Sequence, residues 1–382
     1  MDSFGRLLQR SEPYLTPSTT LKRTPFHAFH AAAGAKLVDF AGYEMPVRYT
    51  GDVREHRCVR EAAGLFDISH MGEFDVRGEG AAAWLDRMVT NDVAGMTVGQ
   101  ALYTPLCRPD GGIVDDLLIY RSAEHFMLVV NASNIAKDMA WLRTSCPADV
   151  ALTDRSDTTA LLALQGPRAA EMLSGHVPAE ALAMPSNRFI EGPLFGVPAV
   201  IARTGYTGED GYELYFDATD AEAVWEGLMV AGRPHGIEAI GLGARDTLRL
   251  EMAYMLYGND IDDTTSPLEA GLGWTVKLGR GDFIGRDVLV RQKEQGTARK
   301  LVGLEAEGRR IPRHGMTVES GGREVGRVTS GAFSPSLERA IAMAYIDTPL
   351  SALGTTLEVA AGSSRIPTHV VKRPFYTRGS RR

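Results

Sequence analysis

The sequence predicts an α+β protein with antiparallel sheets that ends in a small all-β domain. At 382 residues the chain is too long for one ordinary hydrophobic core, so we expect two or three domains. Helical and strand-like segments are interspersed before about residue 285, without the regular β-α-β rhythm of a parallel sheet. After that residue, short alternating runs between Gly-rich turns are typical of a small barrel or sandwich.

The first half of the chain opens with a flexible extension, which we expect over residues 1–22. Thr24-Pro25 then predicts a helix with Pro at its first position, and Gly34 predicts its end. The residue pattern predicts helices over 26–33, 53–63, 81–88 and 134–144. Strands are expected over 36–40, 74–77, 113–120 and 126–130, with the last two forming a hairpin. Residues 102–107 run into a strong turn signal at 108–112.

The second half again mixes helices and strands, and only its last part is predicted to be all β. Helices are predicted over 167–173, 220–231 and 243–256, and strands over 159–165, 198–203 and 212–216. The all-β portion is expected to hold strands over 300–304, 317–319, 324–329, 340–346 and 356–359.

Composition excludes several classes of function. A net charge of −7 and a pI of about 5.8 do not favour a nucleic-acid partner. No apolar run reaches the length needed to cross a membrane. The three cysteines are widely spaced and form no C-x-x-C motif, so we expect no disulfide framework, no metal site and a reducing compartment.

The most informative stretch is RTGYTGEDGYE, residues 203–213, which holds three glycines, two tyrosines and three carboxylates between strand-like flanks. That many glycines indicate a backbone that bends sharply and lies close to something. Tyr206 and Glu213 would then offer a flat ring and a carboxylate to a planar, nitrogen-rich ligand. The alternative is a surface hairpin with a bulge, because G-x-D-G turns are common.

Asp115 and Asp116 interrupt an otherwise apolar strand. Alternation sends their carboxylates to opposite faces, so one should point towards a core or a cavity. A carboxylate there is costly unless it is hydrogen-bonded or has a task. Asn131 ends the next strand and is expected at the same place. The alternatives are a buried structural hydrogen bond or an edge strand with solvent on one side.

Arg245 stands at a helix start that resembles half of a dinucleotide fingerprint, but the third glycine is missing. The helix dipole disfavours a cation there, so we expect the arginine to have an assigned partner, such as a ligand carboxylate or another strand's carboxylate. The alternative is a plain surface ion pair. Together these residues suggest a buried pocket for a planar, partly anionic ligand, without naming a reaction.

Nine segments in order and in register resemble the aminomethyltransferase (T-protein) family of the glycine cleavage system. The resemblance runs from about residue 24 to the end of the chain. The matching segments are TPF (24–26), DFAGYEMP (39–46), FDISHMGE (66–73), GGIVDDL (111–117), RTGYTGEDGYE (203–213), GLGARDTLRLE (241–251), LYGNDI (256–261), SPLEAGL (266–272) and TSGAFSPS (329–336).

The resemblance implies three domains packed as a clover leaf around a channel that holds tetrahydrofolate. Residues 23–285 would form two interleaved α+β domains, the inserted one at about 71–155, and residues 295–376 a β-barrel or jelly-roll-like domain. It implies transfer of the one-carbon unit from the aminomethyl-dihydrolipoyl H-protein to tetrahydrofolate, with release of ammonia and formation of 5,10-methylenetetrahydrofolate. The expected location is the bacterial cytoplasm, or the mitochondrial matrix in a eukaryote.

The resemblance also assigns roles to single residues. Asp116 matches the catalytic aspartate, and Glu213 the carboxylate that accepts the pterin N–H donors. Met71 would add an apolar wall, and arginines of the C-terminal tail, Arg378 or Arg382, would meet the anionic glutamyl tail. The remaining folate-lining positions are Tyr103, Asn131, Tyr206, Arg245 and Tyr254.

Two relatives of this family are alternatives. Tetrahydrofolate-dependent O- or S-demethylases share the fold and take a methyl group from a free small molecule. Non-enzymatic folate-binding factors of iron–sulfur assembly are expected to carry a Lys-Gly-Cys-Tyr-type motif at residues 203–213. This chain has Thr204-Gly205-Tyr206-Thr207 there, without a cysteine.

Overall fold

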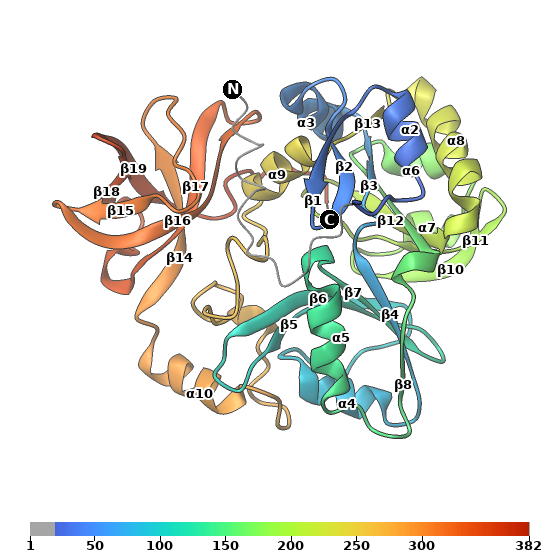
Figure 1. Cartoon of the computed structure of the whole chain (residues 1–382), viewed down its shortest axis with the longest axis horizontal. Coiled ribbons are helices and arrows are strands. Elements are labelled where there is room, and N and C mark those ends of the chain that lie inside the picture. Colours follow the sequence, from blue (N-terminus) through green and yellow to red (C-terminus); the bar gives the residue numbers. More distant parts are fainter. Residues whose placement is uncertain (1–19, 382) are drawn as a thin grey trace.

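The computed structural model describes residues 20–381, which form three lobes (Figure 1). Each lobe is built on one of the three larger sheets. The expectation of an α+β fold with antiparallel sheets and a C-terminal barrel is confirmed. The α-helices are α2 (His27–Ala32), α3 (Asp52–Glu61), α4 (Ala81–Met88), α5 (Ile135–Arg143), α6 (Ala169–Leu173), α7 (Ala179–Ala183), α8 (Ala221–Gly232), α9 (Leu242–Glu251) and α10 (Arg286–Gln295).

The largest open sheet has the strand order β10-β11-β12-β9-β3-β13, and its neighbours are antiparallel except for the parallel pair β3–β13. Leu162, Leu164 and Leu214 of its central strands pack with Trp225 and Leu228 of α8 in one buried cluster. A two-stranded ribbon, β1 (Lys36–Phe40) and β2 (Tyr43–Arg48), lies in the same lobe. The sheet strands are β3 (Gly64–Asp67), β9 (Thr159–Gln165), β10 (Phe189–Leu194), β11 (Val197–Ala202), β12 (Gly211–Asp217) and β13 (Glu238–Ala239).

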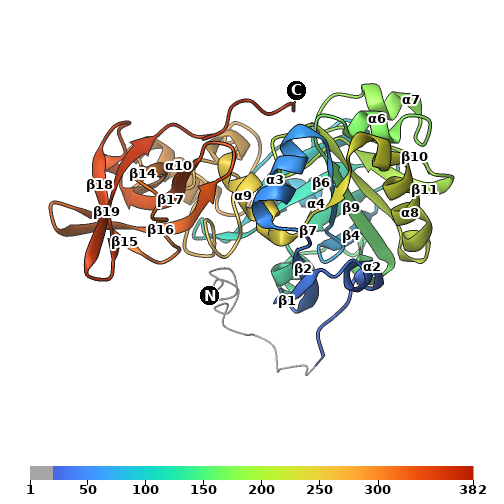
Figure 2. The same cartoon turned by 90° about the horizontal axis from the view of Figure 1, so that it is seen from above.

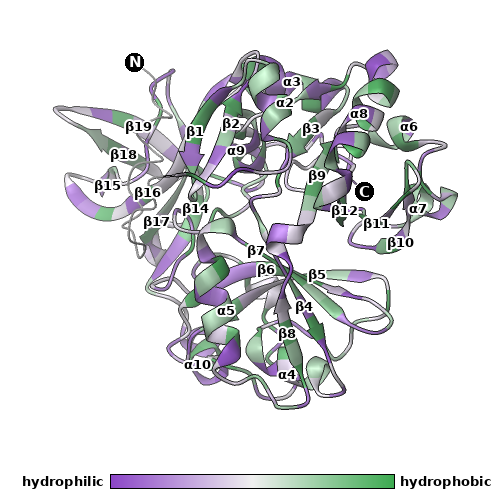
Figure 3. Ribbon diagram, turned by 45° about the vertical axis from the view of Figure 1, so that its right-hand side comes forward, coloured by the Kyte–Doolittle hydropathy of each residue, from purple (hydrophilic) through white to green (hydrophobic). Residues whose placement is uncertain are grey.

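A five-stranded antiparallel sheet forms the second lobe, in the order β5-β6-β7-β4-β8. Trp84 and Leu85 of α4 and Leu142 of α5 share a buried cluster with Leu117 and Leu128 of the sheet. Figure 3 shows hydrophobic residues gathered on the sheet strands, whereas α10 on the outside is mainly hydrophilic. The strands are β4 (Gly72–Arg77), β5 (Gln100–Cys107), β6 (Ile113–Arg121), β7 (Phe126–Val130) and β8 (Ala151–Asp154).

The third lobe is a closed barrel with the order β14-β17-β16-β15-β18-β19. Its last strand was not predicted, because Pro367 interrupts the segment and reads as a strand breaker. The strand forms nonetheless, and it closes the barrel by pairing with both β18 and β14. The barrel strands are β14 (Arg299–Ala306), β15 (Thr317–Ser320), β16 (Arg323–Ser334), β17 (Arg339–Asp347), β18 (Thr356–Ala361) and β19 (Ser364–Val371).

Two helix predictions were wrong at their ends. Helix α9 stops at Glu251 and not at residue 256, because Ala253 takes a left-handed backbone (φ 54°) that turns the chain away. Helix α2 begins at His27, so Pro25 precedes the helix. Thr24 does not cap this helix with its side chain, since its hydroxyl donates to Asp67 Oδ2 at 2.6 Å.

Glu251, at the end of α9, joins three segments of the chain. Its Oε2 lies 2.7 Å from Arg60 Nη2 of α3, and its Oε1 accepts the backbone N–H of Ser336 at the end of the barrel hairpin (3.0 Å). Its backbone oxygen accepts the N–H groups of Phe375 and Tyr376, in the C-terminal tail. Figure 2 shows this tail leaving the barrel and crossing towards the lobe of the six-stranded sheet. Glu251 is therefore a buried residue that connects α3, the barrel hairpin and the C-terminal tail.

We expect Glu251→Gln to remove a large part of the acid sensitivity of the fold. Burial alone would raise the pKa of Glu251, but the hydrogen bond and charge of His56 and the charge of Arg60 lower it to about 2. Because the folded-state pKa is depressed, the stabilisation is present above about pH 4.5 and is lost as pH falls towards 2. It is on the order of 3 kcal/mol, at about 1.4 kcal/mol per pKa unit. Urea denaturation of the wild type and the variant at stepped pH measures the free energy of unfolding. If that free energy fell equally steeply with acid in both proteins, Glu251 would not be the source of the acid sensitivity.

Candidate functional site

A group of polar side chains lies near the start of β6, where Asp115 and Asp116 follow one another in sequence. Asp115 is fully buried, whereas Asp116 is partly exposed, as strand alternation predicts. Asn131 directly follows β7 and reaches both carboxylates: its Nδ2 lies 2.8 Å from Asp115 Oδ1 and 2.9 Å from Asp116 Oδ1. Tyr103 of β5 donates its hydroxyl to Asp116 Oδ2 at 2.8 Å. Asp116 is thus held from two neighbouring strands.

Asp116 has the acid–base property that proton transfer near neutral pH requires. Burial, followed by the charge of Asp115, raises the pKa of Asp116 to about 7, although hydrogen bonds from Tyr103 and Asn131 act in the opposite direction. Asp116 as a residue is not fully buried, unlike its neighbour Asp115. A carboxyl that titrates near the working pH can both take and give a proton.

An aromatic stack comes from the other lobe. The ring of Tyr206, in the loop between β11 and β12, stacks on Tyr254 with centroids 5.6 Å apart and an interplanar angle of 24°. The guanidinium of Arg245 in α9 lies 4.9 Å from the centroid of the Tyr206 ring. The Tyr206 hydroxyl donates to the backbone oxygen of Met255. Three contacts therefore hold the Tyr206 side chain.

The stack and the carboxyl lie within electrostatic range of one another. Burial raises the pKa of Tyr206, and the charge of Asp116 adds to that rise. Burial likewise raises the pKa of Tyr103, with contributions from both Asp116 and Tyr206. Such mutual effects require the side chains to lie within range of one another. The structure therefore brings together residues that are separated by about a hundred positions in the sequence.

Arg245 does not form the ion pair expected of an ordinary surface arginine. Within residues 20–381 it has no carboxylate partner at ion-pair distance, and it is partly buried. Burial lowers its pKa, whereas Tyr206 and Glu213 raise it. The expected carboxylate from another strand is therefore not in direct contact, and the guanidinium lies on an aromatic face instead.

Glu213 lies in β12 and is 8% exposed. Its Oε2 accepts the hydroxyl of Thr204 and, at 3.4 Å, that of Tyr120. Within the described part of the chain these hydrogen bonds all go to Oε2, so Oε1 has acceptor capacity left for a ligand. Met71 is partly buried and packs against the apolar cluster that contains Tyr120.

The glycines of the 203–213 loop are required by protein packing. A Cβ on Gly205 would overlap the side chain of Gln165, and one on Gly211 would lie 2.5 Å from the Leu164 carbonyl oxygen. The prediction of a close approach is confirmed, but the neighbour is the adjacent strand β9. The surface-hairpin alternative is wrong for the tip, where Thr207 and Glu209 are buried.

The C-terminal tail covers this loop. Ser380 donates its backbone N–H and its hydroxyl to Glu209 Oε2, at 2.8 and 2.6 Å. Arg381 donates to the backbone oxygen of Gly205 at 3.0 Å. Arg378 lies over the ring of Tyr376, 5.6 Å from its centroid. Arg382, the other tail arginine expected at the folate, lies outside the described residues.

Trp274 belongs to the same group and was not singled out from the sequence. Its ring stacks on Tyr103, with centroids 5.8 Å apart and an interplanar angle of 23°, and it is 61% exposed. It lies in a short 3-10 turn, Gly273–Thr275, far from β5 in sequence. A tryptophan between a glycine and a threonine carries no distinctive local signal. Only its stacking on Tyr103, the hydrogen-bond partner of Asp116, identifies Trp274 as a member of this group.

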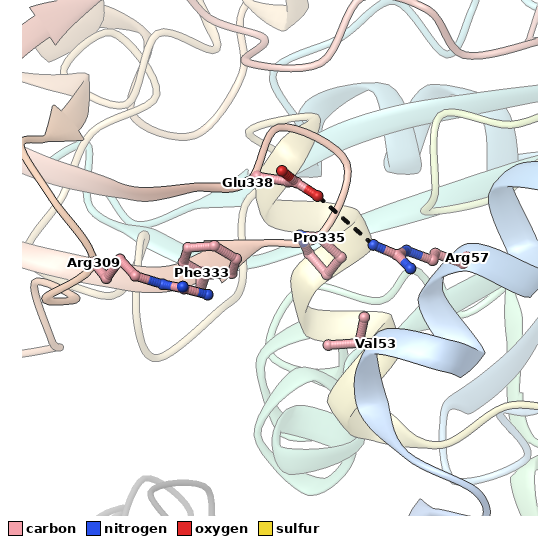
Figure 4. A pocket seen from close by; sticks show the side chains of 6 residues that line it. All are labelled: Val53, Arg57, Arg309, Phe333, Pro335 and Glu338. Carbon is pink, nitrogen blue, oxygen red and sulfur yellow. Dashed lines mark ion pairs between the residues drawn. The ribbon is translucent and has the colours of Figure 1, made fainter.

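Two surface cavities lie away from this group. One, of about 450 Å³, is lined by residues of α3 and the barrel, with Arg57 3.9 Å from Glu338 and Arg309 over the Phe333 ring (Figure 4). The other, of about 460 Å³, lies beside β10 and includes Arg188 and Glu191. Neither is lined by a predicted site residue.

Residues 20–381 lack two kinds of feature. Within that range no cluster of three or more His, Cys, Asp or Glu side chains is placed to hold a metal ion. None of the helices formed by these residues has the length and apolarity to span a membrane.

Comparison with known proteins agrees with the motifs. Residues 26–280 match the GCVT N-terminal domain, and residues 299–377 match the glycine cleavage T-protein C-terminal barrel domain. A protein named Aminomethyltransferase from Symbiobacterium thermophilum is 50% identical over 372 residues, which covers 95% of this chain and 99% of that protein. The Aminomethyltransferase of Bacillus subtilis is 47% identical over 361 residues, which covers 94% of this chain and 100% of that protein.

A solved structure extends the likeness to three dimensions. The crystal structure of glycine cleavage system aminomethyltransferase T from Bartonella henselae superposes with a TM-score of 0.89 at 35% identity. The match covers 95% of this chain and 100% of that one. The chain therefore belongs to the glycine cleavage T-protein family and is an aminomethyltransferase.

Proposed function

We propose that the chain transfers the one-carbon unit of an aminomethyl group, carried on the lipoyl arm of the H-protein, to tetrahydrofolate. Ammonia is released and 5,10-methylenetetrahydrofolate is formed. The observation that carries this proposal is the carboxyl of Asp116, held by Tyr103 and Asn131 with its pKa raised to about 7, within electrostatic range of the aromatic ring of Tyr206. Family membership supplies the reaction class, and this geometry supplies a group able to handle its protons.

Tetrahydrofolate fits the donors and acceptors of this group. A pterin presents adjacent N–H donors, and Glu213 is a nearly buried carboxylate with acceptor capacity left on Oε1. Tyr206 offers a fixed flat ring, and Met71 an apolar side chain. Arg245 keeps a partly desolvated positive charge near Glu213, and Arg378 or Arg382 of the tail would meet the anionic glutamyl end.

Asp116 would act in one of two ways in this reaction. As a base it would take the proton that the attacking folate nitrogen gives up, and pass it to the departing amine. As a fixed charge it would stabilise the positive charge that develops as ammonia leaves. In both roles Tyr103 and Asn131 would hold the carboxylate in place. Asn131 and Tyr254 complete the set of residues that we propose as folate-lining.

The test is an assay of the purified chain with aminomethylated lipoyl H-protein and tetrahydrofolate. Ammonia and methylenetetrahydrofolate should appear together and should both require the chain and the folate. Tetrahydrofolate binding without ammonia release would contradict the proposal and point to a demethylase. No observation here favours a demethylase or an iron–sulfur assembly factor, and the cysteines Cys58, Cys107 and Cys146 lie outside the 203–213 loop.

We expect Trp274→Ala to raise the KM for tetrahydrofolate by up to about tenfold, with a smaller effect on kcat. The proposed reason is that the exposed indole, stacked on Tyr103, offers a face for the flat rings of the ligand, and an aromatic pair contributes about 0.5–1.5 kcal/mol. Steady-state kinetics measure it, with Trp274→Phe as the matched control that restores a ring. An unchanged KM in the alanine variant would remove Trp274 from the site.

The proposed protein partner is the lipoylated H-protein, because its arm must bring the aminomethyl group to Asp116. We propose no nucleic-acid or membrane partner, and the net charge of −7 does not favour nucleic acid. The relatives compared above are bacterial, so we propose the bacterial cytoplasm as the location.

A further inference from the structure

Asp138 is a buried carboxyl that the proposed reaction does not use. It lies in the first turns of α5 and is 0% exposed. Neither of its oxygens receives a hydrogen bond from a donor in residues 20–381. An ionised carboxylate without donors in such a place is very costly, so the group should hold a proton. The helix N-terminus favours the ionised form by only about 0.3–1 kcal/mol, which is less than the cost of burying the charge.

Asp138 follows Asn134 by one helical turn on the same face of α5, and Asn134 Nδ2 lies 2.7 Å from Asp115 Oδ1, so Asp115 is the neighbour of Asp138. Burial, and then the charge of Asp115, raise the pKa of Asp138. Asp115 is well supplied with donors: its Oδ2 accepts the Asn131 N–H at 3.1 Å, and its Oδ1 accepts Asn131 Nδ2 at 2.8 Å and Asn134 Nδ2 at 2.7 Å. Two adjacent buried carboxyls share one negative charge at low cost but not two. Because Asp115 has three amide donors and Asp138 has none, the charge belongs on Asp115 and the proton on Asp138.

We propose that Asp138 is a positioning residue of the reaction: it stays protonated and donates a hydrogen bond to Asp115, which leaves the Asn131 amide free to hold Asp116 as well. This inference rests on the proposed role of Asp116. Asn131 Nδ2 is shared between the two aspartates, at 2.8 Å from Asp115 and 2.9 Å from Asp116. Without the Asp138 donor, Asp115 competes more strongly for that amide.

The direction of the effect follows from the groups that face these carboxyls. Asp115 interacts with Asp116 on the same strand, Asp138 on α5, Tyr103 on β5 and Tyr257 beyond α9, and Asp138 also feels Lys137. Losing the Asp138 donor leaves more of the Asp115 charge unshared, which raises the pKa of Asp116. Weakening the bond from Asn131 to ionised Asp116 raises it further. Both effects have the same sign.

The experiment compares Asp138→Leu with Asp138→Asn, whose amide can still donate to Asp115. In the leucine variant the acid limb of the pH profile of kcat/KM should move up by about 0.5–1 pH unit, with KM changed less than kcat. In the asparagine variant the limb should stay in place. An unmoved limb in a folded leucine variant would reduce Asp138 to a structural role. Equal shifts in both variants would show that Asp138 acts as a charge. Either result overturns the proposal.

A second readout needs neither turnover nor a folded leucine variant. In wild-type protein with isotope-labelled aspartate carboxyl carbons, the NMR signal assigned by its loss in Asp138→Asn should keep the shift of a protonated acid between about pH 5.5 and 8.5. A signal of an ionised carboxylate in that range would overturn the proposal. Because this measurement is independent of the folate reaction, it separates failure of the Asp138 inference from failure of the proposed function.

Discussion

Asp116→Asn should lower turnover by about 10²–10⁴-fold while the fold and tetrahydrofolate binding remain. The substitution keeps the shape of the side chain and an acceptor for the Tyr103 hydroxyl, but it removes the charge and the titrating proton. The base role needs the titrating proton and the fixed-charge role needs the charge, so both roles predict the loss of turnover. Ammonia release with aminomethylated H-protein measures turnover, and calorimetry measures folate binding.

The same variant should be no less stable than the wild type at neutral pH. The folded-state pKa of Asp116 is raised to about 7, so its ionisation opposes folding once pH exceeds the unfolded value. This destabilisation of the fold is absent below about pH 4, grows as pH rises and is complete above about pH 7. The wild type should therefore lose stability over this range relative to Asp116→Asn, which urea denaturation at stepped pH would measure.

A surface aspartate provides the matched control. Asp157 pairs with Lys22, and its side chain is 81% exposed, so Asp157→Asn makes the same chemical change away from the site. Turnover and stability of that variant should match the wild type. If Asp116→Asn behaved like this control, Asp116 would not be the catalytic residue.

Strand alternation correctly placed Asp115 and Asp116 on opposite faces, but it could not reveal that Tyr103 is the partner of Asp116. The pairing of β5 with β6 contains a register shift between Leu106 and Cys107, next to the turn. Because of it, Pro105 pairs with Asp116 and Tyr103 lies two residues along the same face. Without the shift, Tyr103 would share a face with Asp115. This single register shift thus decides which aspartate accepts the hydrogen bond of the Tyr103 hydroxyl.

Several elements escaped prediction, among them strand β10 and helix α10, which occupies Arg286–Gln295 where an all-β region was expected. Two of the missed strands have the same physical cause. Strands β2 and β19 contain Pro46 and Pro367, which are local signals against a strand, and tertiary pairing overrides them. Asp138 looked ordinary, because acidic residues in the first turns of a helix are common and usually exposed. Its burial against Asp115 arises from where α5 packs on the sheet. Local patterns predict elements and single residues, whereas contacts between lobes decide how those residues act.

Glu213→Ala should weaken tetrahydrofolate binding by about 10²-fold or more and change the fold little. The proposed contact is a pair of charge-assisted hydrogen bonds to pterin N–H groups, each contributing about 1.5–3 kcal/mol. The fold tolerates the loss because the hydroxyls left behind can satisfy one another: Tyr120 lies 3.2 Å from Thr204 and 2.9 Å from Tyr215. Calorimetric titration with tetrahydrofolate gives the affinity, and thermal unfolding gives the stability.

Glu213→Gln separates charge from shape at the same position. If the amide oxygen takes the place of Oε2 and keeps the Thr204 and Tyr120 hydroxyls, the NH₂ group stands where Oε1 would meet the pterin N–H groups, so donor faces donor. Binding should therefore remain well below that of the wild type although the side-chain volume is conserved. If the glutamine variant bound as tightly as the wild type, the carboxylate charge would be irrelevant. If the alanine variant did so, Glu213 would lie outside the folate site, and the Tyr206–Tyr254 stack with Arg245 would have to carry recognition alone.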